Sequence, residues 1–287
     1  MIEHLRILPA PDLAAYIYYY RLRTFSTHGM DLLVPWYAIP ETELILFLQG
    51  RPIWCKDEAT GYYVEGDHDI AVLGLSDRFN GMMLLNGSYL QFEIIFMPNG
   101  FHRLFSLPPL PELANRIFNA DAYLGTTGKL LREELQEAPN ISAMRLVADK
   151  FFRSRLSKRT TGHGYDGIAK ISSNMLQLNG MVNISYYARE ANMSMRNFER
   201  RFSQQVGTTP KLFCRMLRFN KVIQYKLSNP SSVWSDIASR FHYHDTMHLV
   251  RDFKDFAGSA PALFFNTTPP PRENYIYYKS CKQKRVI

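Results

Sequence analysis

A chain of 287 residues with 46% hydrophobic and 21% charged residues has the composition of a soluble globular protein of about two domains, which excludes the fibrous and disordered classes. Its longest apolar run, Leu44–Leu48, is too short to span a bilayer, and its first residues lack the basic and apolar regions of a signal peptide. Three scattered cysteines favour neither a disulfide framework nor a metal cluster. We therefore expect a cytoplasmic protein with no membrane association and no metal or other cofactor.

Charge is distributed unevenly along the chain. Residues 1–150 carry 12 basic against 18 acidic side chains, which leaves a net charge of −6. Residues 165–287 carry 18 basic against 8 acidic side chains, which leaves +10. An acidic half joined to a basic half is expected when only one domain meets a polyanion. Charge alone fits RNA, DNA or an anionic membrane equally well.

The first half is predicted to contain β-strands followed by helices. Apolar or aromatic runs between turn residues predict strands at Ala15–Tyr20, Leu44–Leu48, Ile70–Leu75 and Gln91–Met97. Apolar residues at helical spacing predict helices at Pro111–Ala120, Thr127–Glu137 and Ile141–Leu156. The stripe Met144–Phe152 is open to two interpretations, a dimer seam or a face that packs on the chain's own sheet.

A basic segment rich in Gly and Thr, Ser157–Gly164, is interpreted as a linker. It divides a sensor and dimerisation domain, residues 1–158, from a domain of continuous short helices, residues 165–266. A Pro-rich basic tail, residues 267–287, is expected to lie outside both domains.

The strongest signal is an internal repeat in the second half. Six residue pairs share an offset of 51: Phe198 with Leu249, Arg200 with Arg251, Phe202 with Phe253, Gly207 with Gly258, Pro210 with Pro261, and Phe213 with Phe264. Ala188 and Ala238 pair at an offset of 50, so the single extra residue lies in a turn beside His244. This agreement is hard to attribute to chance and predicts two copies of one helical unit.

Each copy has the sequence of a helix-turn-helix, in which two short helices cross closely at a tight turn. The first helix is expected at about Ile184–Ala191 in one copy and Trp234–Phe241 in the other. The turn that follows requires a left-handed backbone, which Asn192 tolerates better than most residues and His242 must adopt in the second copy.

The second helix of each copy begins after a good N-cap, Ser194 or Asp245. It buries apolar residues at positions i and i+4, and these are Phe198 and Phe202, or Leu249 and Phe253. Polar residues then face outward, and these are Arg196, Asn197 and Arg200, or Thr246, His248 and Arg251.

Those outward residues indicate that the two units read duplex DNA. A recognition helix enters the major groove with its N-terminal residues at the base edges, and arginine can bind guanine in a bidentate fashion. The basic helix predicted at Lys211–Lys226 would fix the distance between the units, with Arg215, Arg218 or Lys221 able to reach phosphates. Glu199 is interpreted first as a solvated residue or a partner of a neighbouring arginine.

Residues 165–266 resemble the DNA-binding domain of the AraC/XylS family of transcription regulators. Its most recognisable stretches here are Asp236-Ile237-Ala238, Arg251-Asp252-Phe253-Lys254 and Gly258-Ser259-Ala260-Pro261. This sequence departs from the family pattern at His242, where glycine is usual, and at Leu249, where phenylalanine is common. We therefore expect a second unit that is less well formed or reads DNA more weakly.

The resemblance implies that Arg196, Glu199 and Arg200 face bases in the first unit and Thr246, Met247 and Arg251 in the second, and the outward faces of the helices add Asn197 and His248. The full set expected at base edges is Arg196, Asn197, Glu199, Arg200, Thr246, Met247, His248 and Arg251. The set expected at phosphates is Ser194, Lys211, Arg215, Arg218 and Lys254.

The N-terminal half resembles the small β-rich sensor domains of one branch of this family, on Val34-Pro35, Glu43–Phe47 and Phe96–Phe105. A small-molecule effector pocket is expected among its aromatic residues, with Trp36, Trp54 and Phe92 as the candidates, although such residues are more often core. Asp67-His68-Asp69 invites a metal hypothesis, but the spacing favours a polar turn. His102 is expected at the surface.

The sequence thus predicts an α+β protein of two domains, a cupin-like sensor with trailing helices and an all-α domain of two helix-turn-helix units joined by a linker helix. The predicted function is a DNA-binding transcription regulator, an activator by the family's commoner habit. Double-stranded DNA, RNA polymerase, an effector and a second copy of the chain are its expected partners. The alternative is a cupin-like enzyme with an accessory DNA-binding domain, although no arrangement of catalytic residues is visible.

Overall fold

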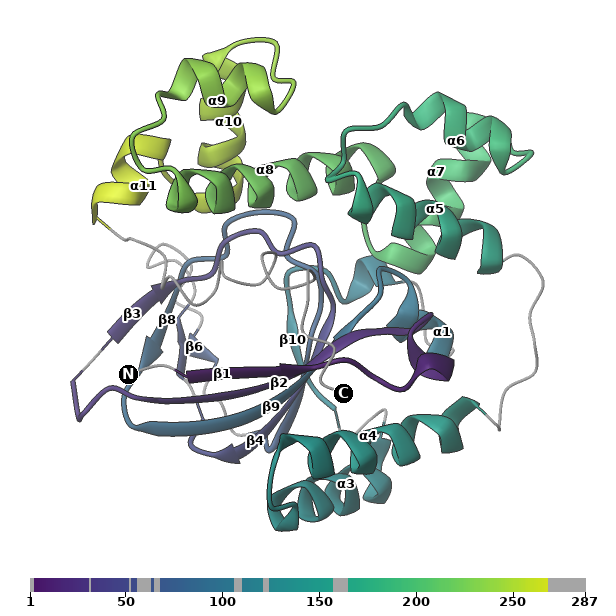
Figure 1. Cartoon of the computed structure of the whole chain (residues 1–287), viewed down its shortest axis with the longest axis vertical. Helices are drawn as coiled ribbons and strands as arrows, with labels where there is room; N and C mark the ends of the chain where they lie inside the picture. Colours follow the sequence, from purple (N-terminus) through teal and green to yellow (C-terminus); the bar gives the residue numbers. More distant parts are fainter. Residues whose placement is uncertain are drawn as a thin grey trace, which may run out of the picture.

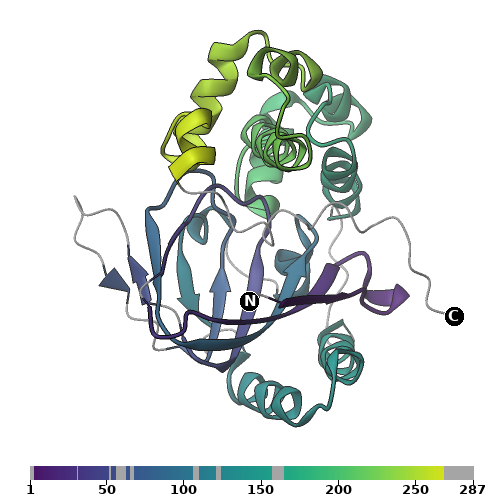
Figure 2. The ribbon, with the colours of Figure 1, turned by 60° about the vertical axis from the view of Figure 1, so that its left-hand side comes forward.

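The computed structural model describes residues 3–30, 32–51, 53–55, 63–64, 68–105, 110–120, 124–156 and 165–267. It comprises a β-rich N-terminal half and a helical C-terminal half (Figure 1). The helical half lies over one end of the barrel formed by the strands, and a second direction of view shows the same arrangement (Figure 2).

The N-terminal strands form two sheets. The larger has the order β1-β2-β9-β4-β7-β10, built from β1 (Glu3–Ile7), β2 (Ile17–Ser26), β9 (Ser88–Phe96), β4 (Glu43–Gln49), β7 (Ile70–Leu73) and β10 (Ile117–Asn119). The smaller has the order β3-β8-β5-β6, built from β3 (Leu32–Pro35), β8 (Met82–Leu85), β5 (Ile53–Cys55) and β6 (Tyr63–Val64). All the described pairings are antiparallel.

Alternation along the strands divides the larger sheet into two faces. On β9, Phe92, Ile94 and Phe96 belong to a core that includes α1 (Gly100–Phe105), α3 (Thr126–Glu137) and α4 (Ile141–Leu156). The alternate residues of the strand, including Gln91 and Glu93, face the other way, into the barrel. One face is therefore apolar and covered by helices, whereas the other carries buried charge.

The stripe on α4 packs on the chain's own sheet. Met144, Ala148 and Phe152 are buried in the core beneath the larger sheet, which is the second of the two interpretations of that stripe. Leu130 of α3 and Leu146 of α4 remain exposed on the outer surface of these helices.

Strands are confirmed at the four predicted places, although β2 begins two residues after Ala15 and continues six residues past Tyr20. The helices predicted at Thr127–Glu137 and Ile141–Leu156 are confirmed as α3 and α4. The helix predicted at Pro111–Ala120 is wrong. This segment begins with the 3-10 turn η2 (Leu110–Glu112), adopts a left-handed backbone at Asn115 with φ of 60°, and ends as strand β10. Residues 117–119 pair with the edge of β7, and these ladder hydrogen bonds override the helical spacing of the apolar residues.

The C-terminal half consists of α5 (Tyr165–Gln177), α6 (Ile184–Glu190), α7 (Met195–Val206), α8 (Pro210–Ser228), α9 (Trp234–Arg240), α10 (Thr246–Ala257) and α11 (Pro261–Thr267). Two apolar cores lie along it. The first joins α5, α6 and α7 to the start of α8, and the second joins the rest of α8 to α9, α10 and α11. Helix α8 belongs to both cores and so holds the two units in one body. None of the helices in the described part of the chain is long and apolar enough to cross a membrane.

The two halves share a core, which the sequence did not predict. Tyr37, Ala38 and Leu75 of the β-rich half are buried among the residues of the second helical core. Asn220 of α8 donates from Nδ2 to the Ala38 carbonyl at 3.1 Å. The Ala38 amide in turn donates to the carbonyl of Phe256 on α10 at 2.8 Å.

Two further hydrogen bonds join the halves. The Phe79 amide donates to the Asp255 carbonyl at 3.0 Å, so a second carbonyl near the end of α10 is capped by the β-rich half. Asn99 donates from Nδ2 to Oε1 of Gln205 on α7 at 3.2 Å, and both residues are buried. Each helix-turn-helix unit therefore contacts the N-terminal half at the C-terminal part of its second helix.

Candidate nucleic-acid interface

The first helix-turn-helix has the predicted local geometry. Asn192 adopts the left-handed conformation at φ of 51°, and the Met193 amide donates back to the Ala188 carbonyl at 3.0 Å. Ser194 caps α7 by accepting a hydrogen bond from the Asn197 amide at 3.3 Å. These contacts satisfy the polar backbone groups of a tight turn between α6 and α7.

The second unit repeats this geometry, although its turn residue is not glycine. His242 adopts the left-handed conformation at φ of 55°, and the Tyr243 amide donates to the Ala238 carbonyl at 2.9 Å. Asp245 caps α10 by accepting from the His248 amide at 2.7 Å. Leu249 is fully buried. The two departures from the family pattern therefore do not disturb the local structure of this unit.

The residues predicted to read bases lie on the outer faces of α7 and α10. Those that are exposed are Arg196, Glu199, Arg200, Met247, His248 and Arg251, and those that are partly buried are Asn197 and Thr246. Arg200 donates from Nη2 to Oδ1 of Asn197 at 2.9 Å, which holds its guanidinium along the helix. The contacts of these residues with bases stay predictions.

The residues predicted at phosphates fall into two groups. Lys211 and Lys254 are exposed at the surface, and Ser194 is exposed at the start of α7. Arg215 and Arg218 instead make contacts within the protein, so any phosphate contact would compete with those contacts.

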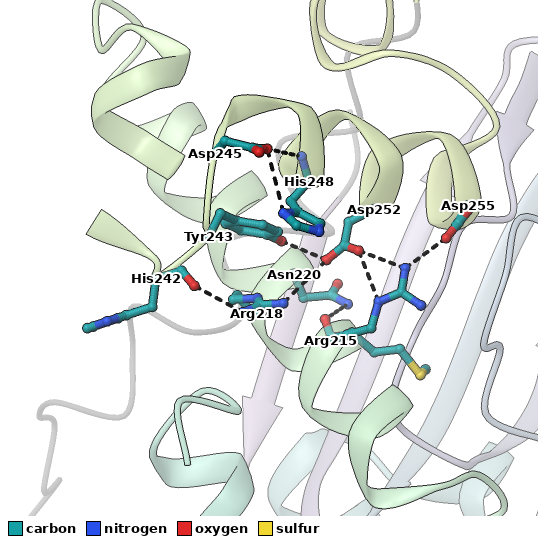
Figure 3. Close-up of polar contacts among 10 residues, drawn as sticks. Arg215, Arg218, Asn220, His242, Tyr243, Asp245, His248, Asp252 and Asp255 are labelled. Carbon is teal, nitrogen blue, oxygen red and sulfur yellow. Dashed lines mark hydrogen bonds and ion pairs between the residues drawn. The ribbon is translucent and has the colours of Figure 1, made fainter. Parts of the chain in front are cut away.

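A network centred on Asp252 holds α10 against α8 (Figure 3). Arg215 donates from Nε and Nη2 to Oδ1 of Asp252 at 3.0 and 2.7 Å, and from Nη2 to the more exposed Asp255 at 2.7 Å. The Tyr243 hydroxyl donates to Oδ2 of Asp252 at 3.0 Å, and burial raises the pKa of this tyrosine. The guanidinium of Arg218 lies 4.2 Å from the centre of the Tyr243 ring.

The same network fixes the turn of the second unit. Arg218 donates from Nη1 to the His242 carbonyl at 3.3 Å. Sequence reasoning missed Asp252, which is only 4% exposed. The signal was present, because a carboxylate between the buried Leu249 and Phe253 on one helix needs a cationic partner.

The predicted effector residues do not lie together. Phe92 is fully buried in the core between the larger sheet and the helices. Trp36 is buried in a core on the opposite face of that sheet, where its Nε1 donates to Oγ of Ser76 at 2.7 Å. The side chain of Trp54 lies outside the described residues. Their role in effector binding stays a prediction.

A buried ionic cluster lies on the inner face of the larger sheet. Arg21 is hydrogen-bonded to Glu93 and lies 3.3 Å from Glu43, and Arg23 lies 3.2 Å from Glu93. Burial raises the pKa of Glu43 from 4.5 to about 7, while Arg21 opposes this shift and Glu93 adds to it.

This shift links the cluster to pH. The Glu43 carboxyl has a higher pKa in the folded chain than in the unfolded chain, so the folded state binds more protons between about pH 4.5 and 7. Its stabilising contribution is therefore fully present below that range and is lost as pH rises through about 7.

A cleft of about 240 Å³ lies where the two halves meet. Tyr18 and Met97 line it from the β-rich half, and it is completed from the helical half by Ser173, Leu176, Gln177, Asn179 and Lys221. Burial lowers the pKa of Lys221. The cleft is small, its lining residues are partly polar and partly apolar, and Lys221 is the cationic group among them.

The remaining candidates of the sequence have other partners. Asp69 forms ion pairs with Arg51 and with Arg132, and Asp67 lies outside the described residues. His102 is partly buried on α1, where a surface position was expected.

The geometry of two matched helix-turn-helix units on one linker helix defines a DNA-binding protein. Residues 187–267 match the family described as a helix-turn-helix domain. The chain therefore carries an AraC-type helix-turn-helix domain and is a DNA-binding transcription regulator. A comparison with curated proteins gave no match.

Solved structures show distant likeness. ToxT from Vibrio cholerae is 12% identical, with 92% of this chain and 97% of that chain covered and a TM-score of 0.45. ToxT from Vibrio cholerae strain SCE256 bound to an unsaturated fatty acid is 12% identical, with 85% and 95% covered and a TM-score of 0.43. The AraC-like transcriptional activator CuxR is 14% identical, with 74% and 84% covered and a TM-score of 0.25. These scores are too low to carry an argument about function, which stands on the helix-turn-helix match.

Proposed function

We propose that α7 and α10 read two boxes of a promoter, each through its exposed N-terminal half. The observation that carries this proposal is the matched pair of capped recognition helices joined by α8, with their polar faces free of the shared cores. Two recognition helices on one body suit major grooves about 34 Å apart on one face of a duplex.

Within each unit, arginine supplies the main base contact. Arg196 and Arg200 on α7, and Arg251 on α10, are exposed, and an arginine can bind a guanine edge with about 1–3 kcal/mol of discrimination. Asn197, Glu199, Thr246, Met247 and His248 complete the two reading faces. Phosphates are contacted by Ser194, Lys211 and Lys254, and by Arg215 and Arg218 when their contacts within the protein rearrange.

Control of DNA binding passes through the shared core. A ligand that alters the strand ends around Tyr37 and Ala38 also alters the packing and capping of α10, because these elements share hydrogen bonds and apolar contacts. We place the effector in the cleft beside Lys221. The effector acts by changing how the second unit sits relative to the first.

The regulator acts in the cytoplasm as a homodimer that activates transcription by contact with RNA polymerase, and we assign it no enzymatic activity. Leu130 and Leu146 are exposed on the neighbouring helices α3 and α4, and we test the dimer interface at these two residues. Replacement of both leucines by glutamate should shift a dimer to the monomer in analytical ultracentrifugation.

The experiment that tests the function is the selection of randomised duplex DNA by the purified chain at near-physiological salt. We expect two enriched boxes about one helical turn apart. Arg200→Ala should lose the preference within one box and Arg251→Ala within the other, by about 1–3 kcal/mol each. Arg189→Ala, an exposed arginine of α6, is the matched control and should leave both preferences unchanged.

The proposal fails if no box is enriched and binding disappears steeply as salt rises, because the chain would then bind polyanions without reading bases. One box that depends on Arg200 alone would remove the reading role from the second unit.

A further inference from the structure

Two histidines and an aspartate meet at the start of the second recognition helix. Nδ1 of His244 lies 3.2 Å from Oδ2 of Asp245, and Nδ1 of His248 lies 3.6 Å from Oδ1 of the same carboxylate. One ligand atom from each of the three side chains lies within 4.8 Å of the others, and all three side chains are exposed. The group lies beside the turn of the second helix-turn-helix, on its predicted DNA-facing side.

The separations suit a small transition-metal ion. Ligand atoms about 2.0–2.1 Å from a tetrahedral ion lie roughly 3.3 Å apart. Oδ2 of Asp245 is already near this distance from Nδ1 of His244, whereas Nδ1 of His248 lies near the other carboxylate oxygen. Three ligand atoms within 4.8 Å of one another therefore close on an ion by rotation of the exposed side chains. Two imidazoles and one carboxylate favour Zn²⁺, Ni²⁺ or Cu²⁺ over Mg²⁺ and Ca²⁺, which prefer oxygen ligands throughout. The open positions of the ion would be filled by water.

The backbone beneath the three side chains is held in place. Arg218 binds the carbonyl of His242, and Tyr243 is buried with its hydroxyl on Asp252, so the turn that carries His244 is fixed to α8. The Asp245 cap fixes the first turn of α10, which carries His248. The cap uses Oδ1 of the carboxylate, whereas Oδ2 faces His244. The donors therefore approach each other without a change of the backbone.

We propose that His244, Asp245 and His248 bind one divalent transition-metal ion of the Zn²⁺, Ni²⁺ or Cu²⁺ class at the second helix-turn-helix. The ion has a consequence for DNA that rests on the proposed function. An ion bound to Nδ1 fixes the His248 ring beside Asp245 and restricts its approach to a base edge, so an occupied site weakens the reading of the second box and leaves the first box unchanged.

The binding test uses the full chain, freed of metal with a chelator and titrated with Zn²⁺ by calorimetry. We expect one Zn²⁺ site whose affinity falls by at least about tenfold in the double variant His244→Gln/His248→Gln. His242→Asn removes an exposed imidazole of the same turn while keeping a residue that tolerates the left-handed backbone, so it is the matched control and should bind Zn²⁺ as the original chain does.

Cu²⁺ supplies a second readout that does not depend on affinity. Its electron paramagnetic resonance spectrum should show coupling to two imidazole nitrogens in the original chain and in the His242→Asn variant, and not in the double variant. The proposal is overturned if the double variant keeps the same Zn²⁺ affinity and the same Cu²⁺ spectrum, or if His242→Asn loses them equally.

The DNA test is separate. With chelator present, both boxes should be bound by the original chain and by the control. With Zn²⁺ present, the original chain should lose affinity for the second box by at least about fivefold, whereas the double variant should not respond. Absence of both boxes in chelator refutes the proposed function and leaves the binding result intact. Equal binding of the second box with and without Zn²⁺ overturns the regulatory consequence.

Discussion

Asp252 is the residue whose replacement tests the second unit most directly. It accepts two hydrogen bonds from Arg215 and one from Tyr243 while almost completely buried. Asp252→Asn keeps the shape of the side chain but removes its charge and one acceptor. A hydrogen bond to a charged group contributes about 1.5–3 kcal/mol, and Arg215 retains Asp255 as a partner, so the expected loss is about 2–4 kcal/mol in the free energy of unfolding.

The assay is urea unfolding followed by far-ultraviolet circular dichroism, with Asp255→Asn as the matched control. Asp255 binds the same arginine but its side chain is 55% exposed, so its replacement should cost less than about 1 kcal/mol. A double-mutant cycle of Asp252→Asn with Arg215→Gln should give a coupling energy of at least about 1 kcal/mol. Equal losses for the two aspartates, or no coupling to Arg215, would refute the assignment of the network as the attachment of α10 to α8.

The difference in unfolding free energy between the Glu43→Gln variant and the original chain should shift by about 2 kcal/mol in favour of the variant as pH rises from 5.5 to 8. The reason is that the original chain loses the proton of Glu43 over this range. Urea unfolding at both pH values measures the difference. Glu93→Gln, which leaves the buried Arg21 and the partly buried Arg23 without the carboxylate that they share, should instead lose stability at both pH values. His242→Gly should gain about 0.5 kcal/mol in thermal unfolding, since glycine adopts the left-handed conformation without steric cost, and a loss would contradict this account. Asn220→Ala should cost about 1–2 kcal/mol and speed hydrogen exchange of the Ala38 amide, whereas unchanged exchange would mean that the contact does not hold the two halves together.

The helix-turn-helix units were predictable because the rules that form them are local in sequence. A cap three residues before its amide partner, a left-handed turn residue and apolar residues at i and i+4 can all be read within about fifteen residues. The repeat then supplied a second, independent reading of the same pattern. Even His242, which departs from the family pattern, adopts the backbone that its place in the repeat requires.

The features that were not predicted depend on partners distant in sequence. Strand β10 forms because β7 offers a free edge some 45 residues earlier, and nothing in the sequence of Ile117–Asn119 identifies β7 as its partner. The contact between Asn220 and Ala38 joins residues 182 positions apart. The domain boundary was expected to separate two cores, whereas Tyr37, Ala38 and Leu75 are buried by helices of the other half.

The candidate site shows the same division. Exposure of the reading faces followed from helical spacing, but the engagement of Arg215 with Asp252 required knowledge of how α8 and α10 pack. A basic residue on a helix was interpreted as a phosphate contact because charge is visible in a sequence, whereas a buried partner is not.

The core shared by the two halves has a consequence for the order in which the protein is completed during synthesis. The segments that carry Ala38 and Leu75 emerge from the ribosome long before α8 and α10, and the 182 residues between Ala38 and Asn220 correspond to a delay of roughly 10–40 s. Throughout that time the apolar end of the barrel is uncovered. The amides of Ala38 and Phe79 also lack the carbonyls of α10 to which they later donate. A message truncated before α10 should therefore yield an insoluble product, and the nascent barrel is the stage at which the chain depends most on chaperones.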